Sequence, residues 1–335
     1  NSGILFVGEN GAGNSLVISD GGRVISDLFG AIGNVSSASN NSVLVTGTNS
    51  AWLSDALVVG FNGSGNSLII SNGGGVTLVA AQSEGFGGII GFGADSTGNS
   101  VLVTGTSGLE TLGALVIGYG GSSNSLVISN GGTVANGFGY IGSLSSSNNS
   151  VLVTGTDSVW TNSGILYVGR GGSSDSLVIS NGGTVVNTEG YIGFTNTASN
   201  NSVLVTGEGS AWNGSIITVG YDGNGNSMVI SNGGTMESAD SAIGNLQTSS
   251  NNSVLVTGAG SLWTNSGDLY VGFEGGGNSL VISDGGTVAN GNGVIGAEAS
   301  SSNNSVLVTG ANSLWTNSGE FNVGVFGSGN SLVIS

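Results

Sequence analysis

The carboxylate side chains are the groups in this sequence with the greatest capacity for chemistry. Two carboxylates suffice for glycoside hydrolysis, one as the acid and the other as the nucleophile or base. The chain has 19 acidic residues. Pairs on adjacent repeats would be Glu189 with Glu208, or Glu237 with Asp240. The alternative is that these are solvated turn carboxylates, and we favour it because the acids occupy different positions of the repeat.

Other catalytic and metal chemistry lacks its usual residues. Without His or Cys, neither Ser-His-Asp nor Cys-His nucleophile systems can form. Zinc and haem sites lack their usual ligands. The Gly-Gly-x-Gly-x-Asp pattern of calcium-binding solenoids is not repeated here. The sequence therefore predicts no enzyme, no catalytic residue, no cofactor and no metal site.

The charge balance and the lack of a long apolar run exclude two classes of partner. The formal net charge is −17, and Arg23 and Arg170 are the only basic residues. Nucleic acids are bound by Lys and Arg that displace counterions from phosphates, which two Arg residues cannot supply. No run of about 18 apolar residues occurs, so we expect no membrane insertion of this segment.

Two alternating segments repeat along the whole chain, and such periodicity indicates a repeat architecture. One reads Asn-Ser-Leu-Val-Ile-Ser and the other Asn-Ser-Val-Leu-Val-Thr-Gly. Successive starts are 25–27 residues apart, except for one interval of 33 residues between Asn66 and Asn99. Thirteen copies therefore share one register of roughly 26 residues, and the exception predicts an insertion around residues 80–98.

Each copy contains three short segments with strand character, separated by Gly, Asn and Ser turns. No segment shows a 3.6-residue period over helix length. A lone turn cannot bury its apolar face, but identical turns stacked about 4.8 Å apart form parallel ladders. We therefore expect an all-β protein, a parallel β-solenoid of about thirteen turns. It should run continuously over residues 1–335 as a fragment of a longer repeat protein.

The Asn that opens each repeated segment has the same strand parity as the interior residues. Stacked amides can hydrogen-bond from turn to turn, so we predict a structural Asn ladder; the alternative is a simple turn residue. Asp175 is the one departure, because a carboxylate accepts but does not donate. The predicted ladder comprises Asn14, Asn41, Asn66, Asn99, Asn124, Asn149, Asp175, Asn201, Asn226, Asn252, Asn278, Asn304 and Asn330.

Large and small residues alternate from copy to copy in the last of the three strand segments, the one that follows the Asn-Ser segment. This alternation would fill a narrow core without voids. Glu110 falls near the large position after the insertion, and we expect a local defect there. The predicted core tryptophans are Trp52, Trp160, Trp212, Trp263 and Trp315.

The fourth position of each repeated segment has outward parity and is always aliphatic. Apolar stripes of this size commonly mark an interface, so these residues are candidates for lateral packing; the alternative is a β-propensity preference on a wet face. The stripe comprises Val17, Leu44, Ile69, Leu102, Val127, Leu152, Val178, Leu204, Val229, Leu255, Val281, Leu307 and Val333.

A second outward set is aromatic and lies on the first of the three strand segments, the one that precedes the Asn-Ser segment. These rings could stack on sugars, or they could stack on one another across turns and stiffen the sheet. The second alternative is favoured. The set comprises Phe6, Tyr140, Tyr167, Tyr191 and Tyr270.

The repeat resembles that of bacterial autotransporter (type V secretion) passengers and of related proteins with cell-surface sorting tails. The resemblance rests on Trp-Thr-Asn-Ser-Gly at 160–164, 263–267 and 315–319, together with the alternating Asn-Ser segments. It implies a right-handed β-helix secreted to the bacterial cell surface. The pattern weakens at residues 80–98 and 105–112.

These observations predict a non-catalytic extracellular structural β-solenoid that forms a surface fibre, stalk or matrix filament. Its expected partners are other copies, in lateral or end-to-end contact, or other segments of the same long chain. The alternative function is an adhesin that binds a glycan or a cell-surface protein. A glycan-cleaving β-helix enzyme is the least favoured alternative.

Overall fold

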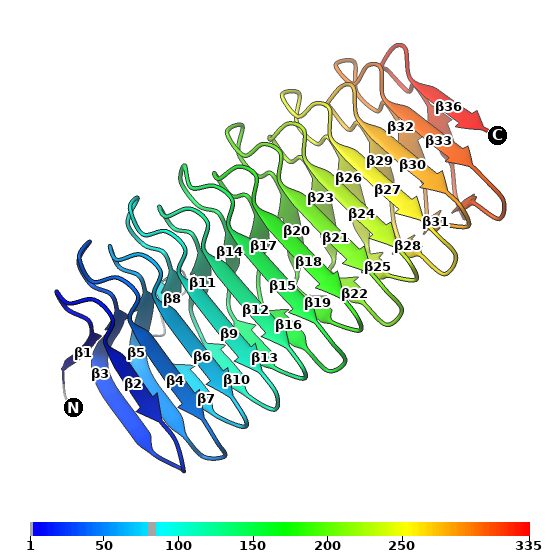
Figure 1. Ribbon diagram of the computed structural model, residues 1–335. Helices are drawn as coiled ribbons and strands as arrows, with labels where there is room; N and C mark the ends of the chain where they lie inside the picture. Colours follow the sequence, from blue (N-terminus) through cyan, green and yellow to red (C-terminus); the bar gives the residue numbers. More distant parts are fainter. Residues whose placement is uncertain (1–2, 80–84) are drawn as a thin grey trace. The chain divides into compact units, whose positions relative to one another are not determined.

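The computed structural model describes residues 3–79 and 85–335. The described residues form strands and turns, and no helix occurs among them. They divide into two compact units, Asn1–Ile165 and Leu166–Ser335, which we call the first unit and the second unit. Each unit consists of three columns of short strands (Figure 1).

The repeated Asn-Ser segments form the first column, in which every strand begins at the Ser after the ladder Asn. In the first unit these Asn-Ser strands are β2 (Ser15–Ile18), β4 (Ser42–Thr46), β6 (Ser67–Ser71), β9 (Ser100–Thr104), β12 (Ser125–Ser129) and β15 (Ser150–Thr154). In the second unit they are β18 (Ser176–Ser180), β21 (Ser202–Thr206), β24 (Ser227–Ser231), β27 (Ser253–Thr257), β30 (Ser279–Ser283), β33 (Ser305–Thr309) and β36 (Ser331–Ile334).

The second column contains the strands that carry the tryptophans, which we call the Trp strands. In the first unit they are β3 (Arg23–Ile32), β5 (Ala51–Val59), β7 (Gly75–Leu78), β10 (Gly108–Thr111), β13 (Thr133–Asn136) and β16 (Val159–Asn162), and β3 and β5 continue into the next column. In the second unit they are β19 (Thr184–Val186), β22 (Ala211–Asn213), β25 (Thr235–Ser238), β28 (Leu262–Asn265), β31 (Thr287–Asn290) and β34 (Leu314–Asn317).

The third column contains the strands that end in an aliphatic residue followed by Gly. In the first unit these Gly-ended strands are β1 (Ile4–Val7), β8 (Phe86–Ile90), β11 (Ala114–Ile117) and β14 (Gly139–Ile141). In the second unit they are β17 (Leu166–Val168), β20 (Glu189–Ile192), β23 (Ile216–Val219), β26 (Asp240–Ile243), β29 (Leu269–Val271), β32 (Gly293–Ile295) and β35 (Phe321–Val323).

Strands of one column pair in parallel, each with the equivalent strand one turn away. Ser202 pairs with Ser227, which pairs with Ser253, and Trp212 pairs with Met236. Equivalent side chains therefore lie over one another, one repeat apart in sequence. The prediction of an all-β parallel β-solenoid of about thirteen turns is confirmed. Its continuity over residues 1–335 and its right hand stay predictions.

The interior is filled by alternate residues of each strand. Along an Asn-Ser strand such as β21, Val203 and Val205 are buried, whereas Leu204 is only half-buried. Period-two alternation of this kind is what a strand with one buried face requires. In the Trp strands, a buried tryptophan alternates with a smaller buried residue: Trp160 pairs with Val134, and Trp263 pairs with Met236.

A recurrent turn joins each Asn-Ser strand to the following Trp strand. Asn130 occupies the left-handed region with φ 51°, a conformation that Asn and Gly tolerate best. Its Nδ2 donates to Thr104 Oγ1 of the preceding turn at 3.2 Å. The next amide, Gly131 N–H, donates to Ser158 Oγ of the following turn at 3.0 Å. The turn is thus tied in both directions along the solenoid axis.

Two predicted irregularities lie in the first unit. Residues 80–84, at the start of the predicted insertion, lie outside the described residues, whereas Phe86–Ile90 forms β8 and pairs with both β5 and β11. The expectation of a local defect at Glu110, near the large core position, was wrong. Leu109 pairs with Val76 and Val134 and is buried, and Glu110 points outward. The turn before β10 is one residue shorter, which shifts the register of the sequence.

Candidate functional site

The predicted ladder residues form a continuous hydrogen-bonded column within each unit. In the second unit, Asn226 Nδ2 donates to Asn252 Oδ1 at 3.1 Å, and Asn226 Oδ1 accepts from Asn201 Nδ2 at 3.0 Å. Backbone amides add a parallel set, since Asn226 N–H also donates to Asn252 Oδ1 at 2.8 Å. In the first unit, the equivalent amide bonds run from Asn14 to Asn149. We call this column the Asn ladder.

Asp175 within the Asn ladder and Gly193 beside it show which side chains these positions accept. Asp175 is fully buried in the same column, and its backbone N–H donates to Asn201 Oδ1 at 2.9 Å. Its carboxylate lacks the amide donor that every other turn supplies. Gly193 ends a Gly-ended strand with φ 74°, and a Cβ there would lie 2.1 Å from Asn226 Nδ2. The glycine that ends each strand is therefore required by the approach of the ladder amide.

A second buried polar column lies where the Trp strand bends into the Gly-ended strand of the next turn. Here the tryptophan Nε1 donates to a side chain one turn back. Trp160 Nε1 donates to Asn136 Oδ1 at 2.7 Å, Trp212 Nε1 to Asn187 Oδ1 at 2.6 Å, and Trp315 Nε1 to Asn290 Oδ1 at 2.6 Å. We call this column the Trp corner.

One turn of the Trp corner is incomplete. Trp263 is fully buried, and its Nε1 has no hydrogen-bond partner. The residue one turn back is Ser238, whose hydroxyl donates to Asn265 Oδ1 at 2.5 Å and lies 2.9 Å from Ser241 Oγ. A serine can serve in principle, because Trp52 Nε1 donates to Ser26 Oγ at 3.2 Å. Ser238 is already engaged elsewhere.

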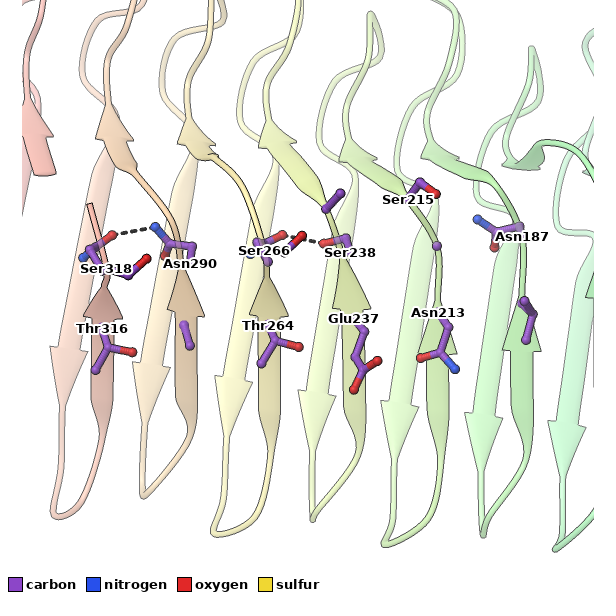
Figure 2. A pocket seen from close by; sticks show the side chains of 16 residues that line it. Asn187, Asn213, Ser215, Glu237, Ser238, Thr264, Ser266, Asn290, Thr316 and Ser318 are labelled. Carbon is purple, nitrogen blue, oxygen red and sulfur yellow. Dashed lines mark hydrogen bonds between the residues drawn. The ribbon is translucent and has the colours of Figure 1, made fainter. Parts of the chain in front are cut away.

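Outside the Trp corner of the second unit lies a groove of about 910 Å³. Figure 2 shows its side chains arranged in rows over successive turns. The outward row of the Trp strands is Val186, Asn213, Glu237, Thr264, Ala289 and Thr316. The inner row includes Asn187, Ser238, Asn265, Asn290 and Asn317, and Ser215, Ser266 and Ser318 lie beyond it. We call this the polar groove.

The same corner of the first unit carries a smaller groove of different character. Its volume is about 400 Å³. Leu112 and Val79 line it and are exposed by 72% and 49%. Asn136 and Thr161 also line it. The corner geometry is thus shared, whereas the lining is polar in the second unit and largely apolar in the first.

The fourth-position aliphatic residues lie on the outer face of the Asn-Ser strands. Val17, Ile69 and Val333 are exposed, and the other members of the stripe are half-buried. Adjacent members pair directly, as Leu204 does with Val229. The apolar side chains therefore form a line down this face within each unit.

Aromatic rings stack across turns on the Gly-ended strands. Tyr167 and Tyr191 stack with ring centroids 5.6 Å apart, and Tyr191 meets Tyr221 edge-on at 5.3 Å. A row that the sequence reasoning missed is formed by aromatic residues that follow some of the terminal glycines: Phe61 stacks on Phe92 at 4.6 Å and Phe92 on Tyr119 at 5.1 Å in the first unit. The signal was an aromatic residue directly after the glycine. This geometry favours the stiffening alternative over sugar stacking.

The acidic residues proposed as pairs lie on separate elements. Glu237 lines the polar groove on β25, and Asp240 opens β26, where its Oδ1 accepts from Asp268 N–H at 2.8 Å. Glu208 lies in the turn before β22, and Glu189 on β20 accepts from Tyr191 O–H at 2.7 Å. Within the described ranges, no group of three or more acidic residues is placed to hold a metal ion.

Two tyrosines have their ionisation suppressed. Burial, followed by the hydrogen bond to Asp268 and the charge of that carboxylate, raises the pKa of Tyr270 to about 12. The bond joins Tyr270 Oη to Asp268 Oδ2 at 2.9 Å. Burial and the hydrogen bond to Glu189 raise the pKa of Tyr191 further. Both phenols therefore remain neutral donors at physiological pH.

The fold and its columns define a parallel β-solenoid repeat protein. No protein-family model and no curated protein matches the chain. Among solved structures, the chain is similar to a TibA fragment, residues 55–350 of that protein, hyper-glycosylated by TibC. The TM-score is 0.50 at 13% identity, and the match covers 99% of this chain and 98% of that one. At this identity the likeness concerns the fold alone. In the described ranges, no helix is long or apolar enough to span a lipid bilayer.

Proposed function

We propose that the chain is a non-catalytic structural segment of a secreted protein at the bacterial cell surface, within a fibre, stalk or matrix filament. The observation that carries this proposal is the Asn ladder, in which buried side chains are used to tie one turn to the next. Buried polar groups that are fully hydrogen-bonded specify one packing arrangement. The resemblance to autotransporter passengers and the fold of the TibA fragment support an extracellular location.

Immunogold electron microscopy tests the location and the role together. Antibodies raised against the folded chain should label extended material outside the envelope of the producing cells. Labelling confined to the cell interior would contradict the proposal. The non-catalytic role is tested by incubating the chain with polysaccharides and measuring new reducing ends. We expect none, and release that disappears in Glu237→Gln would show that this carboxylate is catalytic.

The apolar stripe on the Asn-Ser strands supports lateral packing against another copy or another segment of the same long protein. Half-buried aliphatic side chains in a continuous line gain hydrophobic free energy when covered. In sedimentation velocity at increasing concentration, the chain should associate, and a Leu204→Ser, Leu255→Ser variant should associate less. A chain that stays monomeric at all concentrations would contradict lateral packing. The aliphatic stripe would then be explained by the preference of strands for such residues.

A second candidate function is adhesion through a bound glycan or cell-surface protein. The observation that favours it is the polar groove, which is larger than the groove of the first unit and is lined mostly by amide- and hydroxyl-bearing residues. The TibA fragment is itself glycosylated, so a fold of this kind is compatible with sugars at its surface. The polar groove, rather than the aromatic rows, is where such binding would occur.

A further inference from the structure

We propose that the polar groove of the second unit binds an uncharged oligosaccharide chain. The inference rests on the adhesive candidate function and names the ligand class of that site. It is independent of the structural role, because the groove lies outside the Trp corner and its outward row takes no part in the Asn ladder.

The composition of the groove selects against acidic polymers. Glu237 is the only ionisable residue that lines it, and no cation does. The whole chain has a formal net charge of −17, so acidic polysaccharides and nucleic acids are repelled at long range. The remaining polar contacts come from neutral amides and hydroxyls such as Asn213, Thr264 and Thr316, and each can both donate and accept, as sugar hydroxyls do.

Two unpartnered donors lie at the floor of the groove. Asn187 and Asn265 line it and are 6% and 4% exposed, yet the Nδ2 atom of each has no hydrogen-bond partner. Asn187 Nδ2 is directed towards the neighbouring turn (Figure 2), and a Cβ on Gly214 would lie 2.8 Å from it. Gly214 also lines the groove. The absence of a side chain at Gly214 therefore leaves room for this buried donor directly beneath the groove lining.

The strand arrangement argues against a peptide ligand. An extended peptide binds by adding a strand to a free sheet edge. Here β22, β25 and β28 each pair with a strand on both sides, so no edge is open. The outward row also offers no buried apolar pocket for an anchoring side chain. Its hydroxyls and amides instead repeat about every 4.8 Å along the groove, a linear array suited to a chain of sugar units.

Binding of hexasaccharides to the whole chain tests the proposal, by calorimetry with cellohexaose, laminarihexaose, xylohexaose and mannohexaose as neutral probes. We expect at least one to bind. An Asn213→Ala, Thr264→Ala variant should bind that probe at least tenfold more weakly. The matched control is Ser202→Ala, Ser253→Ala, which removes two outward hydroxyls from the Asn-Ser strands of the same turns and should bind like the unchanged chain. Circular dichroism melting checks that both variants fold.

The inference fails if no neutral hexasaccharide binds, or if the groove variant binds as tightly as the control. It also fails if binding is confined to a chitosan hexamer and is weakened by salt and by Glu237→Gln, because the ligand class would then be cationic amino sugars. A polygalacturonate hexamer serves as the acidic probe, and we expect no binding of it. Surface labelling by immunogold is unaffected by these variants, so the structural role stands or falls separately.

Discussion

The Asn ladder and the Trp corner are both buried columns of polar side chains, yet they differ in completeness. In the Asn ladder, the same residue type recurs, and its amide bonds within each unit measure 2.9–3.2 Å. In the Trp corner, the residue type changes from turn to turn. Trp212 has a partner in Asn187, whereas Trp263 has none.

The difference follows from what each column faces. The Asn ladder is packed against backbone, as the approach of Asn226 to Gly193 shows, and Asp175 is the one position in it that is not Asn. The Trp corner borders the grooves, so a residue such as Ser238 can vary without loss of the strand pairing around it. The nearly uniform Asn ladder holds the turns in register, whereas the residues of the Trp corner can vary and change the lining of the adjacent groove.

The largest effect is expected from an Asn→Asp change in the Asn ladder. Asn226→Asp removes the side-chain Nδ2 group that donates to Asn252 Oδ1 and to Ala198 O, and it should lower the free energy of unfolding by about 3 kcal/mol or more, since each buried unsatisfied group costs about 1–3 kcal/mol. Burial raises the folded-state pKa of the new carboxyl group. The loss should therefore be small at low pH and grow as the pH rises through that pKa.

Urea unfolding at several pH values measures this loss. The matched control is Asn232→Asp, the same change at an exposed turn where Asp20 and Asp284 occur in other repeats. We expect the control to change stability by about 0.5 kcal/mol or less. Equal losses in the two variants would mean that the Asn ladder has no special role.

In the Trp corner, Asn187→Ala should leave the Nε1 of Trp212 without a partner, as that of Trp263 is. It removes the acceptor of the Trp212 Nε1 bond and should destabilise the chain by about 1–3 kcal/mol. Asn213→Ala, on the same corner but outward and half-buried, is the control for loss of an amide. If both variants melted alike, the indole bond would contribute nothing measurable.

The reverse change should be stabilising. Ser238→Asn offers Trp263 the acceptor that Asn290 offers Trp315, and its Nδ2 can donate to Asn265 as Asn290 donates to Asn317. We expect a gain of about 1 kcal/mol. In a double-mutant cycle with Trp263→Phe, which lacks the indole N–H, the gain should vanish, so the two positions should show a coupling energy of about the size of the gain. A gain that persisted in the Phe background would have another origin.

The smallest effect concerns the tyrosines beside the corner. The pKa of Tyr270 is raised to about 12 in the folded chain, above the ordinary value of about 10. The folded state thus holds this proton more tightly than the unfolded state, and stability should fall as the pH rises from about 10 towards 12. NMR titration of ring-labelled tyrosine measures the pKa. Asp268→Asn should lower it, and Asp222→Asn, remote from Tyr270 in sequence and corner, should not.

Most of the fold could be predicted from periodicity alone. The fixed spacing of the Asn-Ser segments sets the register, and strand parity separates Leu204 from Val203 and Val205. The same parity placed the stripe residues on the outside. The prediction failed at Glu110 because the turn before β10 is one residue shorter than the turns after the other Asn-Ser-Val-Leu-Val-Thr-Gly segments. A one-residue shift in the alignment of the repeats moves every side chain to the other face of the strand.

The polar groove could not be predicted because it depends on how sharply the chain bends between the Trp strand and the Gly-ended strand. The sequence did contain a signal for its floor: Asn265 and Asn317 each follow a tryptophan by two residues. That spacing alone does not reveal that Trp212 bonds to Asn187 of the preceding turn. Pairings between turns arise from stacking, which a single repeat does not encode.

The recurrent Asn-Gly turn has a consequence for chemical ageing. Asn-Gly sequences lose ammonia spontaneously when the glycine nitrogen attacks the Asn carboxamide to form a cyclic imide, which water then opens to Asp or isoaspartate. In Asn130–Gly131 the attacking N–H is held by Ser158 Oγ and the carboxamide by Thr104 Oγ1, and the same pair of contacts recurs at Asn72 and Asn232. Mass spectrometry after long incubation should find these sites intact, and Ser158→Ala should accelerate the reaction at Asn130. The hydroxyls that tie the turns together thus also extend the working lifetime of an asparagine-rich protein.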